Sequence, residues 1–145
     1  MDYNASFHIS ATGMTVEKMR LDVAAANLAN AHTTAAPGTA LYKPLRVVSR
    51  ETPMLFSEQY GKLSGVQDGG AEVAAVEPMN VPPTMMYEPG HPDADSKGFV
   101  SYPGVNNTSE MVNMVTALRA YEANVVAMNA AKVMAQRTLE IGGQS

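Results

Sequence analysis

An uninterrupted helical pattern from Asn107 to Ile141 is the feature that most constrains the fold. Neither proline nor glycine occurs in it, and the glycine pair Gly142-Gly143 follows directly, where glycine commonly ends a helix. Asn107, with Glu110 three residues later, resembles a capping box at its start. A helix of this length would extend about 50 Å at 1.5 Å per residue. It therefore needs packing partners along most of its length.

Apolar and aromatic side chains recur in this segment with the 3-4 spacing of a coiled-coil seam. The series is Met111, Met114, Leu118, Tyr121, Val125 and Met128. We predict that four of them pack helices together or support assembly, namely Met111, Leu118, Tyr121 and Val125. The methionines are either gap-fillers in a core or parts of an adaptable interface.

A second helix is predicted from about Asn4 to Asn30, with an apolar stripe that includes Met14, Leu21 and Leu28. Alanines are frequent in it, and they favour helix and allow another helix to approach closely. The segment is either an ordinary core helix or a helix that pairs with the C-terminal helix and with neighbouring subunits. We predict the pairing, antiparallel or steeply crossed, through Met14, Leu21 and Leu28.

Between the helices the character of the chain changes, because most of the prolines and glycines lie there. Four short strands are predicted, at Leu45–Arg50, Glu72–Glu77, Thr84–Glu88 and Gly98–Tyr102. The expected fold class is therefore α+β, with long terminal helices packed as a coiled-coil-like pair around a small β-rich insert. The expected parts are 1–34, 35–105 and 106–145.

Composition narrows the classes of function. The net charge of −4 disfavours a nucleic-acid partner, which would require a basic face. The absence of cysteine excludes disulfides, thiol catalysis and Cys-ligated zinc. No apolar run approaches the length of a membrane span. The first residues lack a basic region followed by an apolar one, so we expect no cleaved signal peptide.

Two amides, Asn27 and Asn30, lie three residues apart and so share one helical face. Asparagine often ends helices, because it tolerates the left-handed conformation. The alternative role is a polar contact with an adjacent subunit. Asn124, beside Tyr121 in the C-terminal helix, is a third candidate for such a contact.

The segment from Asp93 to Gly98 begins like a calcium loop, but Lys97 stands at a ligand position and Gly104 replaces the bidentate glutamate. A solvated turn is the favoured interpretation. A metal-dependent enzyme built on His91, Asp93 and Asp95 is the alternative. No zinc-protease, phosphate-loop or nucleophile-elbow motif occurs. We therefore expect no enzymatic activity and no cofactor.

Three stretches together resemble the flagellar basal-body rod family, most closely its proximal-rod members. The first, Ser10–Thr33, contains Asn27-Leu-Ala-Asn-Ala, which looks like the signature of rod and hook proteins. The second runs from Tyr87 to Asn106 and contains Tyr-Glu-Pro-Gly-His-Pro-Asp-Ala-Asp. The third, Glu110–Val125, is similar to the family's C-terminal helix. The resemblance covers essentially the whole chain.

The resemblance implies a structural subunit that polymerises through its terminal helices into a tube that transmits torque and encloses the type III export channel. Implied partners are copies of itself, other rod proteins, neighbouring basal-body components and the export apparatus. The implied location is the rod, where it crosses the periplasm. A soluble or secreted coiled-coil adaptor that self-associates through its terminal helices is the alternative function.

Overall fold

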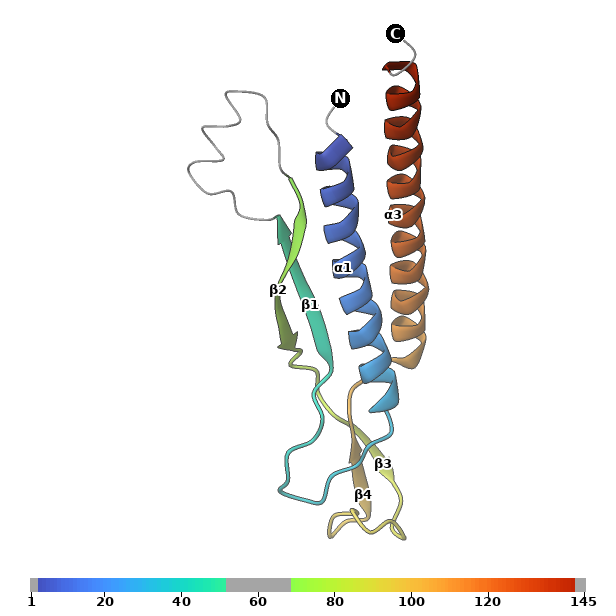
Figure 1. The fold of residues 1–145 in the computed structure, drawn as a ribbon. Coiled ribbons are helices and arrows are strands. Elements are labelled where there is room, and N and C mark those ends of the chain that lie inside the picture. The colour runs from blue at the N-terminus through green and yellow to red at the C-terminus, as the bar shows by residue number, and fades with distance from the viewer. Residues whose placement is uncertain (1–2, 52–68, 143–145) are drawn as a thin grey trace. The chain divides into compact units, whose positions relative to one another are not determined.

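The computed structural model describes residues 3–51 and 69–142, which form two long helices and four strands (Figure 1). In chain order these are α1 (Tyr3–Ala29), β1 (Leu45–Glu51), β2 (Ala71–Pro78), β3 (Thr84–Tyr87), β4 (Phe99–Tyr102) and α3 (Asn107–Gly142). The helices pack together, and the strands of the insert form two small antiparallel sheets. The predicted α+β class is confirmed, and each predicted element agrees within one residue at either end.

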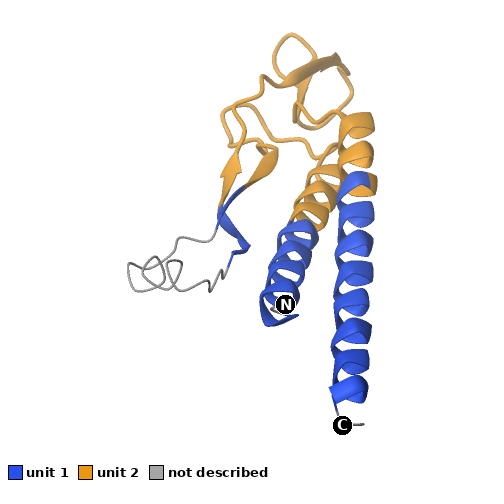
Figure 2. Ribbon diagram, turned by 90° about the horizontal axis from the view of Figure 1, so that it is seen from above, with its two compact units in different colours: residues 1–19, 49–74, 116–145 blue, residues 20–48, 75–115 orange. Residues whose placement is uncertain are grey.

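The chain divides into two compact units, coloured separately in Figure 2. Unit 1 contains residues 1–19, 49–74 and 116–145, and unit 2 contains residues 20–48 and 75–115. Both helices contribute to both units, so the units do not follow the three predicted parts. The division into 1–34, 35–105 and 106–145 stays a prediction, and residues 52–68 of it lie outside the described chain.

The start of α3 is fixed by Asn106. Its Oδ1 accepts the Ser109 backbone N–H at 3.0 Å, which satisfies one of the free amides of the first turn. The predicted cap at Asn107 is therefore wrong by one residue. Glu110 follows in the first turn, where the helix dipole favours a carboxylate.

Each sheet of the insert has two strands, β1 with β2 and β3 with β4. Two ion pairs join β1 to β2: Arg46–Glu77 at 3.1 Å and Arg50–Glu72 at 2.6 Å. In the second sheet Thr84 pairs with Tyr102 and Tyr87 with Phe99, which fixes an antiparallel register. All four residues of β3 are exposed, whereas Val100 in β4 is fully buried.

In residues 3–51 and 69–142 the buried aliphatic side chains are small, because apart from the prolines Pro44 and Pro103 they are all valine or alanine. The valines and alanines are Val16, Val23, Ala24, Ala31, Val100, Ala117 and Ala131. The buried polar residues are Ser10, Asn27 and Glu110. Most of the larger apolar side chains are only partly covered or exposed. The described chain therefore buries less apolar surface than its composition would allow.

Candidate assembly surface

In unit 1, α1 and α3 approach closely at Gly13. A Cβ atom placed on Gly13 would lie 3.0 Å from both Nδ2 and Oδ1 of Asn124. Asn124 in turn donates from Nδ2 to the Ala120 carbonyl at 3.0 Å. Nearer the start of α1, the hydroxyl groups of Tyr3 and Thr138 share a hydrogen bond of 3.0 Å. The two contacts show that these helices run antiparallel in unit 1.

The side of α3 that is buried or half-buried follows a regular 3-4 spacing, and we name this series the inner stripe. Its members are Met114, Ala117, Tyr121, Asn124, Met128 and Ala131. Two of them are alanines with about 3% exposure or less. Small side chains allow the close approach at Gly13, because a large residue there would hold the helices apart.

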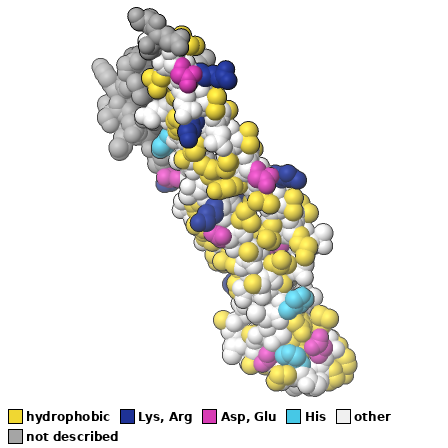
Figure 3. Space-filling model, turned by 45° about the vertical axis from the view of Figure 1, so that its right-hand side comes forward, with side chains coloured by type: hydrophobic (Ala, Val, Ile, Leu, Met, Phe, Trp, Pro, Cys, Tyr) yellow, Lys and Arg dark blue, Asp and Glu magenta, His cyan; other side chains and the backbone are white. Residues whose placement is uncertain are grey.

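A second apolar series lies on a different side of α3 and is exposed; we name it the outer stripe. Its members are Met111, Val115, Leu118, Val126 and Val133. Leu118 is 45% exposed and Val126 67%. Figure 3 shows hydrophobic side chains across much of the face drawn, between scattered charged groups. An ordinary surface helix has one apolar face, whereas α3 has two.

The predicted packing residues are divided between these surroundings. Met14, Leu21 and Leu28 of α1 are half-buried, as are Tyr121 and Val125 of α3. Met111 and Leu118 belong to the exposed outer stripe. The predicted seam therefore contains members of both stripes. Its role in assembly stays a prediction.

Asn27 forms a buried polar cluster in unit 2. Its Nδ2 donates to the Leu45 carbonyl at 2.8 Å, and its Oδ1 accepts the Leu45 backbone N–H at 2.8 Å. The same oxygen accepts the Tyr42 hydroxyl at 2.8 Å. Burial and, to a lesser extent, the nearby Glu110 carboxylate raise the pKa of Tyr42, which keeps the phenol protonated as a donor.

The three predicted polar-contact residues are thus placed differently. Asn27 uses three of its amide hydrogen bonds within the chain. Asn30 donates to the Ala26 carbonyl at 2.8 Å, and both Asn30 and Asn124 are half-buried. Contacts of these amides with another subunit stay a prediction. Sequence reasoning missed Gly13 and Tyr42; a lone glycine inside a helical pattern was the available signal for the former.

The loop from His91 to Gly98 is a hydrogen-bonded turn. Asp95 Oδ1 accepts the backbone N–H groups of Phe99 at 2.9 Å and Lys97 at 2.8 Å. The Phe99 bond first, and then the Lys97 bond and charge, lower the pKa of Asp95. Gly98 has a φ of 82°, which closes the turn and which other residues rarely adopt.

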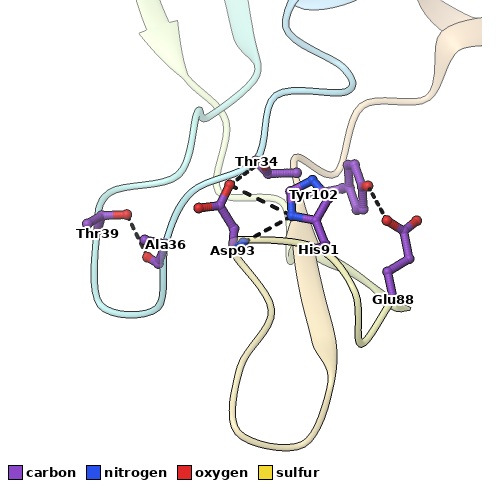
Figure 4. A network of polar contacts seen from close by, with 7 residues as sticks. All are labelled: Thr34, Ala36, Thr39, Glu88, His91, Asp93 and Tyr102. Carbon is purple, nitrogen blue, oxygen red and sulfur yellow. Dashed lines mark hydrogen bonds and ion pairs between the residues drawn. The ribbon is translucent and has the colours of Figure 1, made fainter.

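Polar contacts tie this loop to the chain that follows α1 (Figure 4). The Thr34 hydroxyl donates to Asp93 Oδ2 at 2.5 Å, and Tyr102 donates to Glu88 at 3.2 Å. Burial and Glu88 raise the pKa of Tyr102. In the part of the chain that the structure describes, no three His, Asp or Glu side chains are grouped so that they could hold a metal.

Comparison with known proteins shows which family the chain belongs to. Residues 96–141 match the family described as flagellar basal body rod FlgEFG protein, C-terminal. The flagellar basal-body rod protein FlgC of Escherichia coli O6:H1 is 39% identical over 136 residues, which cover 94% of this chain and 95% of the relative. The chain belongs to the FlgC family of flagellar basal-body rod proteins. The resemblance seen in the sequence is confirmed.

Relatives from distant bacteria extend the match. FlgC of Bacillus subtilis is 36% identical, with 94% of this chain and 96% of the relative covered. FlgC of Aquifex aeolicus is 31% identical, with 97% of both covered. The chain is therefore a structural rod protein of the flagellar basal body. None of the helices in residues 3–51 and 69–142 has the length and apolar character needed to cross a membrane.

Proposed function

We propose that this chain is a subunit of the proximal rod and polymerises through α1 and α3 into a tube that transmits torque and encloses the export channel. The observation that carries the proposal is the outer stripe of α3. The proposed role of the chain is mechanical rather than enzymatic.

Exposed apolar side chains in such a stripe favour association. Burying a whole Leu, Val or Met side chain contributes roughly 1.5–3 kcal/mol. Leu118 is 45% exposed, so about half of that contribution, on the order of 1 kcal/mol, is available to a partner. The five members of the outer stripe together would contribute several kcal/mol before the cost of association is subtracted. A second helix that covered the stripe would gain this energy.

The partners that follow from this proposal are other copies of the chain, other rod proteins and the basal-body components at either end of the proximal rod. The subunit would lie in the rod where it crosses the periplasm, and would reach it through the flagellar type III export apparatus. A net charge of −4 gives no support for a nucleic-acid partner.

The test is Leu118→Asp in cells whose only copy of the gene carries the change. Because Leu118 is exposed in the single chain, the helix content of the purified variant should equal that of the wild type. In an assembled rod the carboxylate would be buried without a partner, at a cost of several kcal/mol. We expect basal bodies without complete rods and loss of swimming. Leu118→Met, which retains an apolar side chain of similar size, should swim normally.

Complete rods in Leu118→Asp cells would contradict the proposal. The adaptor alternative is tested on the same purified chains by sedimentation at low concentration. An adaptor would form a small closed oligomer that Leu118→Asp dissociates. A rod subunit should remain largely monomeric with either residue.

A further inference from the structure

The side-chain amide of Asn27 forms a reciprocal pair of hydrogen bonds with the backbone of Leu45, as two paired strand residues do. It donates to the Leu45 carbonyl and accepts the Leu45 N–H, each at 2.8 Å. Two residues in an antiparallel ladder exchange the same pair of bonds. β1 begins at Leu45, so a helix side chain supplies the hydrogen-bonding partner at the first residue of the strand.

Water does not readily replace this partner, because Asn27 is only 1% exposed. The residue before Leu45 also has a hydrogen-bonding partner outside α1. Pro44 is buried, and its carbonyl accepts the N–H of Met79, the residue after β2, at 2.6 Å. The Tyr42 hydroxyl adds a third bond to Asn27. Residues 42–45 are therefore fixed by α1 and by the chain after β2.

From this geometry we infer that Asn27 is a positioning residue that couples the folding of the last turns of α1 to the docking of residues 42–45 and the start of β1. The amide reaches Leu45 only when the backbone around Asn27 is helical, because the helix fixes where the side chain lies. Unfolding of these turns would release the strand. The inference concerns the single chain and does not depend on whether the chain polymerises.

Asn30 provides an internal comparison. It has the same side chain three residues later, but its Nδ2 donates to the Ala26 carbonyl of its own helix. An amide that only helps to end a helix makes a bond of that kind. None of the three hydrogen bonds of Asn27 is made to α1. Asn27 therefore positions another part of the chain, whereas Asn30 helps to end the helix.

The test is amide hydrogen exchange, resolved by residue, on the full chain in sucrose, which favours compact states. Asn27→Ala leaves the Leu45 N–H and C=O without their partner, so exchange at Leu45 should accelerate about 10- to 100-fold. Amides at Leu21 and Val23 should keep their protection. Asn30→Ala is the matched control and should leave exchange at Leu45 unchanged.

Unchanged exchange at Leu45 in Asn27→Ala would overturn the inference, as would an equal loss in Asn30→Ala. If the Asn27→Ala chain does not fold, the inference is tested on the wild-type chain by measuring hydrogen exchange at increasing urea concentrations. The amides of Leu45 and of residues 26–29 should lose protection at the same urea concentration. Protection at Leu45 that persists after residues 26–29 exchange freely would refute the coupling.

Discussion

Gly13 allows a quantitative test of how closely α1 and α3 pack in unit 1. In a helix interior, alanine is favoured over glycine by about 1 kcal/mol. The added Cβ would lie 3.0 Å from both polar atoms of the Asn124 amide. The amide must then move by a few tenths of an ångström, which weakens its bond to the Ala120 carbonyl. Such a bond contributes about 0.5–1.5 kcal/mol, so the gain and the loss nearly cancel.

A double-mutant cycle separates these two effects. Gly13→Ala in the wild-type chain should change the free energy of unfolding by less than about 0.5 kcal/mol, because the helix preference and the crowding are of similar size. In Asn124→Ala the amide is gone, and Gly13→Ala should then stabilise the chain by about 1 kcal/mol. The coupling energy between the two sites is therefore expected to be on the order of 1 kcal/mol.

The assay is urea unfolding of the four chains, followed by helical circular dichroism in the same sucrose-containing buffer. A stabilisation of 1 kcal/mol raises the urea midpoint by roughly 0.3–1 M, because m is about 1–3 kcal/mol per molar urea. Equal stabilisation by Gly13→Ala in both backgrounds would show that Asn124 does not crowd this position. The helix approach described for unit 1 would then be refuted.

Two further predictions concern the insert. A Cβ on Gly104 would lie 2.5 Å from the carbonyl oxygen of Pro82, a backbone atom that cannot rotate away. Gly104→Ala should therefore lower the free energy of unfolding by about 1–3 kcal/mol. The control Gly90→Ala, with no atom within 4 Å of the added Cβ, should leave it unchanged, and equal urea midpoints for the two variants would refute the clash. The pKa of Asp95 is lower in the folded chain than in the unfolded one, so the stability that the Asp95 turn contributes is present above about pH 4 and lost as the pH falls through the folded value. Hydrogen exchange at the Phe99 amide, corrected for its intrinsic pH dependence, should therefore accelerate in acid in the wild type. It should not accelerate in Asp95→Asn, which keeps an acceptor oxygen at all pH values. Acceleration in both chains would show that protonation of Asp95 is not the cause.

The elements could be predicted from the sequence because local signals mark them. Proline and glycine bound the insert, short runs with β-branched residues such as Val47-Val48 mark strands, and an unbroken run marks α3. Which side of α3 packs on α1 could not be predicted, because apolar residues occur on two sides. The large side chains of Met111 and Leu118 suggested the seam, whereas the close contact with Gly13 is made by Asn124. The most buried residues on that side of α3 are Ala117 and Ala131. Small residues carry little hydrophobic signal but permit the closest approach.

The site was predictable in part for a related reason. The spacing of Asn27 and Asn30 predicts a shared helical face, but the different hydrogen bonds of the two amides depend on where residues 42–45 lie in space. Leu45 is 18 residues from Asn27 in the chain, and no local pattern reports on that distance. Tyr42 gave no signal of its own, since its role exists only beside the buried amide.

The outer stripe of α3 also determines how association should respond to temperature. Removing apolar surface from water has little enthalpy near 25 °C and lowers the heat capacity. If the outer stripe supplies the contact, association is driven by solvent entropy and has a negative heat-capacity change. Contacts of this kind weaken on cooling and strengthen in sulfate, whereas contacts made by surface charges weaken as salt is added. If the chain polymerises as proposed, a contact made by these valine, leucine and methionine side chains would weaken in the cold and persist as salt is added.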